Sequence, residues 1–111
     1  MDPRIQIVSS ILENGLSSTL RTSDLSHSVN LSSSRLRHLF RTETGKSVGQ
    51  YRKDARLEKA RVLLRTTLLS VKEIMHHVGI SSNSHFARDF KEECGLSPTQ
   101  YRARSQESPS I

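Results

Sequence analysis

Two short stretches of the sequence, residues 32–41 and 82–91, combine serine, basic and large apolar residues at regular spacing. Phe86 and Phe90 stand four positions apart, which is typical of an amphipathic helix with one buried face. The basic residues around them then lie on the outer face. An arginine there can donate two hydrogen bonds to a phosphate or to the O6 and N7 atoms of guanine. These residues therefore favour nucleic-acid recognition.

The two stretches are copies of one unit. An offset of 50 aligns them, and an offset of 49 aligns the residues upstream, so the second copy has one inserted residue. Each copy reads as a helix, a tight turn and a second helix, which predicts two helix-turn-helix units. The pairs at offset 50 include Leu36 and Phe86, Phe40 and Phe90, Glu43 and Glu93, Gly45 and Gly95, Ser47 and Ser97, Gln50 and Gln100, Tyr51 and Tyr101, and Arg52 and Arg102; those at offset 49 are Leu25 and Ile74, Val29 and Val78, and Leu31 and Ile80.

The second helix of each copy is expected to read base edges, because a helix-turn-helix presents the N-terminal half of that helix to the major groove. Arginine suits guanine, and the amide of Asn83 suits adenine. Ala87 leaves room for close approach or for a thymine methyl group. The expected readers are the outward residues left once the core is assigned: Ser34, Arg35, Arg37 and His38 in the first copy, and Asn83, Ser84, Ala87 and Arg88 in the second.

A second set of residues is expected to contact the DNA backbone. Four serines precede helices, where free backbone N–H groups suit a phosphate. Helix capping explains these serines without any ligand, and it accounts for most of the stabilisation that they provide. The expected backbone contacts are Ser32, Arg41, Ser47, Arg52, Ser82, Lys91 and Ser97.

The elements around these residues are all expected to be helices, because nothing alternates with period two for long enough to form a strand. Pro3 opens a first helix, with Ile5, Val8, Leu12 and Leu16 inward and a stop near Gly15. We expect one all-α domain over residues 1–111, with seven helices and two homeodomain-like lobes. Its parts are a first lobe over about 3–46, a linking helix over about 47–66, a second lobe over about 67–104, and a frayed tail over 105–111.

Composition limits the possible functions. The chain has 111 residues, of which 33% are hydrophobic, so it is too short for a large enzyme with an enclosed cavity. A formal net charge of +6 favours a polyanionic partner. Cys94 is the only cysteine, which excludes an internal disulfide and a cysteine-based zinc cluster. We find no apolar run long enough for a membrane span and no signal peptide, so we expect a soluble cytoplasmic protein.

Catalysis is the first alternative, and the sequence offers little for it. The best candidates would be His76 and His77, His85, and Glu92 with Glu93. Adjacent residues on a helix point about 100° apart, so neither pair converges on one metal or proton. No two histidines stand four residues apart to hold a metal. We therefore expect no enzyme, no cofactor and no metal site.

The second copy ends in G-x-S-P-x-x-Y-R, from Gly95 to Arg102, R-L-E-K-A-R-x-L-L spans 56–64, and V-K-E-I occupies 71–74. Together with Phe86 and Phe90, these motifs resemble the AraC/XylS transcriptional regulators over about residues 5–104. V-K-E-I is similar to the same family's fifth helix. Ser26 and Met75 stand where the family usually has alanine, and Ile80 where it has phenylalanine.

The resemblance implies a bacterial, nucleoid-associated regulator that binds double-stranded DNA. Its third and sixth helices would enter neighbouring major-groove segments, and its fourth would bridge the two lobes. The resemblance also implies contact with RNA polymerase in addition to DNA. Many relatives carry a separate effector-binding or dimerisation domain, so any small-molecule effector would act through a domain absent from this chain. The family's base-contacting sites fall on Ser34, Arg37 and His38, and on Asn83, Ser84, Ala87 and Arg88.

A protein-interaction module is the second alternative. Such a helix-turn-helix would dock on RNA polymerase or on another regulator without reading DNA. It would be expected to lose its outward arginines, whereas this chain keeps Arg35, Arg37, Arg41 and Arg88. The sequence therefore favours DNA reading.

Overall fold

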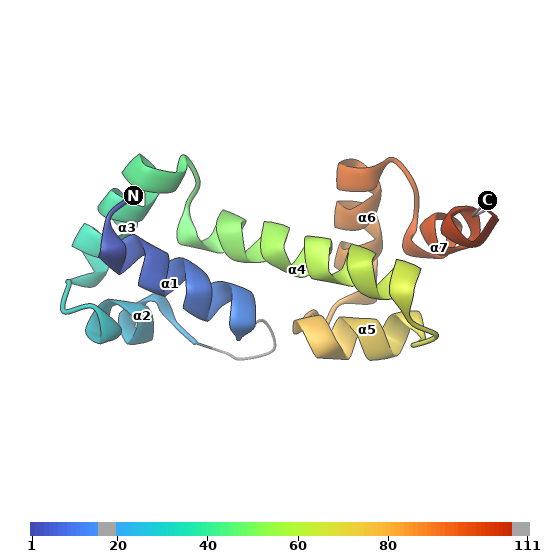
Figure 1. Ribbon diagram of the computed structural model, residues 1–111, viewed down its shortest axis with the longest axis horizontal. Coiled ribbons are helices and arrows are strands. Elements are labelled where there is room, and N and C mark those ends of the chain that lie inside the picture. The colour runs from blue at the N-terminus through green and yellow to red at the C-terminus, as the bar shows by residue number, and fades with distance from the viewer. Residues whose placement is uncertain (16–19, 108–111) are drawn as a thin grey trace. The chain divides into compact units, whose positions relative to one another are not determined.

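The structure is a computed structural model that describes residues 1–15 and 20–107 (Figure 1). Every regular element in these ranges is an α-helix, as the sequence predicts. Leu16, expected on the inner face of the first helix, lies outside the described residues, as does the end of the expected tail, 108–111. The helices are α1 (Pro3–Asn14), α2 (Thr22–Ser28), α3 (Ser33–Thr44), α4 (Val48–Thr66), α5 (Val71–Val78), α6 (Asn83–Cys94) and α7 (Pro98–Glu107).

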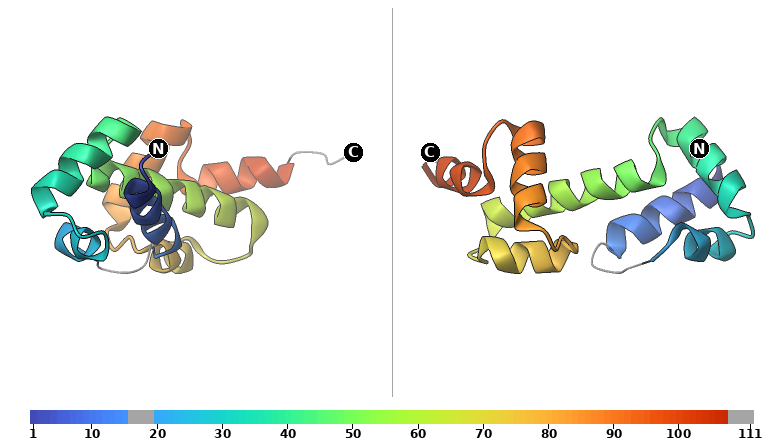
Figure 2. Two further views of the ribbon diagram at one scale, coloured as in Figure 1. Left: turned by 60° about the vertical axis from the view of Figure 1, so that its left-hand side comes forward. Right: turned by 180° about the vertical axis from the view of Figure 1, so that it is seen from behind.

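The chain forms two compact units, Met1–Ala55 and Arg56–Ile111, and the division between them falls inside helix α4. Unit 1 therefore contains α1, α2, α3 and the first part of α4. Unit 2 contains the rest of α4 with α5, α6 and α7. In unit 2, α6 runs crosswise to α5 in Figure 1 and in the rear view of Figure 2. The sequence predicts a linking helix over about 47–66; in the structure, Val48 of α4 lies in the core of unit 1, and Leu57, Ala60 and Leu64 lie in the core of unit 2.

Each unit has its own hydrophobic core, built from one face of every helix. Phe40 in unit 1 and Phe90 in unit 2 are both fully buried. The core of unit 1 contains Ile5, Val8, Leu12, Leu25, Val29, Leu36, Phe40 and Val48. The core of unit 2 contains Leu57, Ala60, Leu64, Ile74, Met75, Val78, Phe86 and Phe90.

The internal repeat extends beyond the helix-turn-helix motifs. The buried stripe of α1 matches the buried stripe of the second half of α4 at an offset of 52, which pairs Ile5 with Leu57, Val8 with Ala60 and Leu12 with Leu64. The start of α4 matches α7, because Tyr51 packs edge-on against Phe40 at 5.2 Å between ring centroids and Tyr101 does so against Phe90 at 5.6 Å. Helix α4 thus serves as a closing helix for unit 1 and an opening helix for unit 2.

The two turns have the same backbone conformation but different lengths. Asn30 has φ 56° and Gly79 has φ 78°, both in the left-handed region that asparagine and glycine tolerate best. The amide that follows each donates to the preceding helix, from Leu31 to the Ser26 carbonyl at 3.0 Å and from Ile80 to the Met75 carbonyl at 2.9 Å. Ser81, before the cap of α6, is the inserted residue.

Ser26 and Met75, which differ from the family's usual alanine, are accommodated in the two cores. The hydroxyl of Ser26 is buried and donates a hydrogen bond of 2.9 Å to the carbonyl of Ser23, so it has a partner. Met75 is also buried, and its flexible side chain fills space in unit 2. Neither residue interrupts its helix.

Helix α7 is longer than the sequence suggested. The expected frayed tail began at residue 105, but the helix continues to Glu107, and the hydroxyl of Ser105 donates to the carbonyl of Tyr101 at 2.9 Å. The guanidinium of Arg102 secures α7 to the end of α4, because it donates to the carbonyls of Leu64 at 3.1 Å and Thr67 at 3.2 Å. The polar composition of the tail concealed this helical turn.

Candidate nucleic-acid interface

All of the expected base readers on α3 have exposed side chains. Ser34, Arg35, Arg37 and His38 are exposed, while Leu36 between them is fully buried. With about 100° between successive residues, Ser34 and His38 lie near the centre of the outer face, and Arg35 and Arg37 lie on opposite flanks of it. The helix therefore presents hydrogen-bond donors across a broad outer surface.

The expected readers on α6 are exposed in the same way. Ser84, Ala87 and Arg88 are exposed on α6 away from the buried Phe86 and Phe90, and Asn83 is exposed at the first position of the helix. The Nε atom of Arg88 lies 3.5 Å from a carboxylate oxygen of Asp89. An ion pair this exposed is worth about 0–1 kcal/mol, so Arg88 can exchange Asp89 for another acceptor at little cost.

The four serines expected to meet DNA backbone all cap helices. The Oγ atoms of Ser32 and Ser82 accept from the amides of Arg35 at 3.2 Å and His85 at 3.3 Å. Ser47 and Ser97 accept from the amides of Gln50 at 3.1 Å and Gln100 at 3.2 Å. Capping thus uses one lone pair of each serine oxygen, and each hydroxyl proton can still be donated to a phosphate.

The basic residues of the backbone set differ in exposure. Arg41 and Lys91 are exposed near the ends of α3 and α6. Arg52 is half-buried, and its counterpart in the repeat, Arg102, is occupied with the end of α4. Arg41 and Lys91 are therefore better placed than Arg52 to reach a phosphate.

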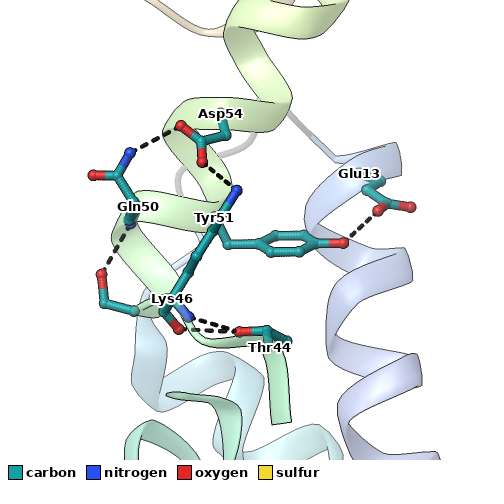
Figure 3. Close-up of polar contacts among 7 residues, drawn as sticks. Glu13, Thr44, Lys46, Gln50, Tyr51 and Asp54 are labelled. Carbon is teal, nitrogen blue, oxygen red and sulfur yellow. Dashed lines mark hydrogen bonds and ion pairs between the residues drawn. The ribbon is translucent and has the colours of Figure 1, made fainter. Parts of the chain in front are cut away.

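A polar cluster fixes the start of α4 against the rest of unit 1 (Figure 3). Lys46 pairs with Asp54 at 2.7 Å, Gln50 donates to Asp54 at 2.8 Å, and the hydroxyl of Tyr51 donates to Glu13 on α1 at 2.5 Å. Partial burial acts to raise the pKa of Asp54, but the hydrogen bonds from Lys46 and Gln50 outweigh burial and leave this pKa lowered. Asp54 is therefore ionised at neutral pH.

The two outward helices differ in charge. Helix α3 carries three arginines and one glutamate, whereas α6 carries one arginine, one lysine, one aspartate and two glutamates. The formal charge is therefore +2 on α3 and −1 on α6 with histidine neutral. A polyanion is attracted more strongly to α3.

Arg4 was not among the expected site residues, yet it lines a pocket beside α3. Ser34, Arg35 and His38 line the same pocket, which has a volume of about 440 Å³. The sequence offered only one signal for it, a single arginine next to Pro3. The pairing of α1 with α3 was needed to bring Arg4 to the reading surface.

The structure shows neither a metal centre nor a membrane segment in the part of the chain that it describes. Over residues 1–15 and 20–107, we find no group of three or more histidine, cysteine, aspartate or glutamate side chains that could hold a metal. Among those residues, no helix combines the length and apolarity that crossing a bilayer requires.

Two helix-turn-helix units, each with an exposed polar and basic second helix, define the class of protein, and comparisons with known proteins agree. Residues 25–104 match the family model described as "Helix-turn-helix domain". The arabinose operon regulatory protein of Escherichia coli is 35% identical over 108 residues, which cover 96% of this chain and 37% of that protein. The transcriptional activator RhaR of Yersinia pestis is 30% identical and is also covered over 37% of its length.

Solved structures agree with this assignment. An AraC-type DNA-binding regulator from Chromobacterium violaceum has a TM-score of 0.87 and 28% identity, with 96% of each chain covered. The DNA-binding domain of AdpA, solved in complex with a target DNA, has a TM-score of 0.84 and 28% identity, with 96% of this chain and 95% of that chain covered. The chain belongs to the AraC/XylS family of helix-turn-helix proteins. It spans just over a third of the length of the curated relatives that it matches.

Proposed function

We propose that this chain is the sequence-specific DNA-binding part of a transcriptional regulator, with α3 and α6 reading two successive major-groove segments. The observation that carries the proposal is the repeated second helix, which exposes hydrogen-bonding side chains outward while it buries its other face. The family and the AdpA complex with DNA support the same function. No residue is assigned a catalytic role.

The residue roles follow from side-chain chemistry. Arg35, Arg37 and Arg88 are proposed to donate to guanine, and Asn83 to form paired hydrogen bonds with adenine. Ser34, His38 and Ser84 are proposed to contact base edges with single hydrogen bonds, and Ala87 to accept a thymine methyl group. Backbone contacts are proposed for Ser32, Arg41, Ser47, Arg52, Ser82, Lys91 and Ser97.

Further partners are proposed on the basis of the family. The curated relatives are named as operon regulators and transcriptional activators, so we propose that the bound protein acts on transcription, with RNA polymerase as its second partner. Because this chain spans only part of their length, we assign no effector site to these 111 residues. A regulator of this kind would work in the bacterial cytoplasm, close to the nucleoid.

Selection of bound duplexes from a random pool, followed by affinity measurements on variants, tests the proposal. We expect Arg37→Ala and Arg88→Ala each to weaken specific binding by roughly 1–3 kcal/mol and to relax preference at one base pair. Arg104→Ala removes an exposed arginine from α7 and is the matched control, with base preference unchanged. If Arg88→Ala left the base-preference profile intact, α6 would not be a reader.

A further inference from the structure

The pocket beside α3 lies entirely within unit 1, and its polar lining comes from two helices. Arg4 contributes from α1, while Ser34, Arg35 and His38 contribute from α3. Leu31 and Leu39 supply the apolar part of the lining. A lining that combines cationic and hydrogen-bonding groups with apolar side chains suits a phosphodiester together with its deoxyribose, since the phosphate needs donors and the sugar needs van der Waals contact.

Arg35 lies on one flank of α3 and not at the centre of the outer face of the helix. Arg35 and Leu39 are four residues apart and share one flank, which borders the pocket. Arg37 lies two residues along, about 160° away around the helix axis, and does not line the pocket. Arg35 therefore lines the same pocket as Arg4, while Arg37 faces another direction.

Arg4, which lines the pocket, is paired with Asp2 in a solvent-accessible position. Its Nε and Nη2 atoms donate to the carboxylate of Asp2 at 3.2 and 3.0 Å, and its side chain is 46% exposed. Asp2 also caps α1 by accepting from the amide of Arg4 at 2.8 Å, and its own amide donates to Glu43 at 3.3 Å. Water and salt screen an exposed pair of this kind, so a DNA phosphate can replace the Asp2 carboxylate as the partner of Arg4.

We propose that Arg4 is a DNA-backbone contact, and that Arg4 and Arg35 hold one phosphodiester of the strand that borders the groove read by α3. The interface of unit 1 then extends from α3 onto α1, and Asp2 is the resident counter-ion that the phosphate displaces. This assignment rests on the proposed DNA-binding function. It moves Arg35 from base reading to backbone contact.

The salt dependence of binding tests the proposal on the full chain. We expect Arg4→Gln to weaken binding roughly fivefold at 0.15 M salt on every duplex alike and to lower the slope of log K against log salt by about 1. Arg35→Gln should do the same and leave base preference intact. Arg104→Gln is the control of equal charge change on α7. Asp2→Asn keeps a capping side chain but removes the competing charge, so it should tighten binding by about twofold to fivefold.

The outcomes separate this inference from the proposed function. If Arg4→Gln and Arg104→Gln behave alike while Arg37→Ala still alters base preference, the pocket is not a phosphate site and the DNA-reading function stands. If the unaltered protein selects no sequence from a random pool, the function fails first. Inorganic phosphate at millimolar concentration should not shift the amide signals that line the pocket. Saturable binding of free phosphate there would assign the pocket to a small anion and overturn the proposal.

Discussion

Units 1 and 2 share one skeleton and differ on the surface that it presents. In both, a serine-capped helix of twelve residues ends at a left-handed glycine, with φ 77° at Gly45 and 78° at Gly95. Both bury large apolar residues at the matching positions of that helix. Outward, however, α3 has three arginines and α6 has mixed charge. The repeat therefore preserves the residues that determine the fold, while the residues available to a ligand have diverged.

This difference suggests a division of labour between the two units. A helix of formal charge +2 gains more from counterion release than a helix of formal charge −1. We expect unit 1 to supply most of the salt-dependent affinity. Unit 2, with Asn83, Ala87 and Arg88, is expected to contribute mainly discrimination between bases.

The largest expected effect tests whether the two cores are equivalent. Phe40→Ala and Phe90→Ala should each cost about 3–5 kcal/mol of the free energy of unfolding, because both rings are fully buried. Phe90 should cost about 0.5–1.5 kcal/mol more, since its ring meets both Phe86 and Tyr101 whereas Phe40 meets only Tyr51 among the described aromatic rings. Urea unfolding, monitored by amide hydrogen exchange in each unit, measures the two losses in the free energy of unfolding. Equal losses would show that the aromatic contacts add nothing beyond burial.

The turns provide the next comparison. Gly79→Ala should cost about 1–2 kcal/mol, because a Cβ atom is strained at φ 78°. Gly79→Asn should cost less, because the first turn accommodates Asn30 in the same backbone region. Thermal unfolding of the two variants checks their order. An equal loss would mean that asparagine gains nothing at this turn.

A single added charge should reduce the electrostatic difference between the outward helices. Ala87 occupies the position of Arg37 in the repeat, and Ala87→Arg should strengthen non-sequence-specific binding roughly fivefold at 0.15 M salt. The slope of log K against log salt should steepen by about 1. Ala87→Gln has similar length without the charge and is the control. If both variants bind alike, charge on α6 does not limit affinity.

The smallest expected effect depends on pH and is confined to unit 1. The hydrogen bond from Tyr51 to the Glu13 carboxylate, together with partial burial, raises the pKa of Tyr51 above its ordinary value of about 10. The stabilisation is therefore fully present below pH 10 and is lost as the pH rises through the raised pKa. We expect a loss of about 0.5 kcal/mol that Tyr51→Phe abolishes, measured by urea unfolding across the alkaline range. Tyr101→Phe, which should not remove the alkaline loss, is the control.

The sequence predicted the helix-turn-helix pairs well because their signals are local. Serine caps, left-handed glycines and buried residues four apart occur within a few residues of one another, so the bounds of α3 and α6 could be read directly. The exposure of the expected base-reading residues could also be predicted, because helix residues that do not belong to the core face solvent. Their contacts with bases remain a prediction.

What the sequence could not supply depends on packing between distant segments. The likeness of α1 to the second half of α4 has one identical pair at its core positions, Leu12 and Leu64, and otherwise only matching burial, so it became clear from the structure alone. The hydrogen bonds from Arg102 to Leu64 and Thr67 join residues 38 and 35 positions apart, so no local signal in the sequence indicates them. The same holds for Arg4, which is 30 residues from Ser34 in the chain but lines the same pocket.

The continuity of helix α4 determines how readily the two units could be separated. Because the border between Ala55 and Arg56 falls within a continuous helix, no exposed loop marks where one unit ends and the other begins. A protease would have to unwind a helical turn to separate them there, and a recombination event at that point would interrupt a folded segment. The pair is therefore expected to resist cleavage at its midpoint and to be inherited as one piece.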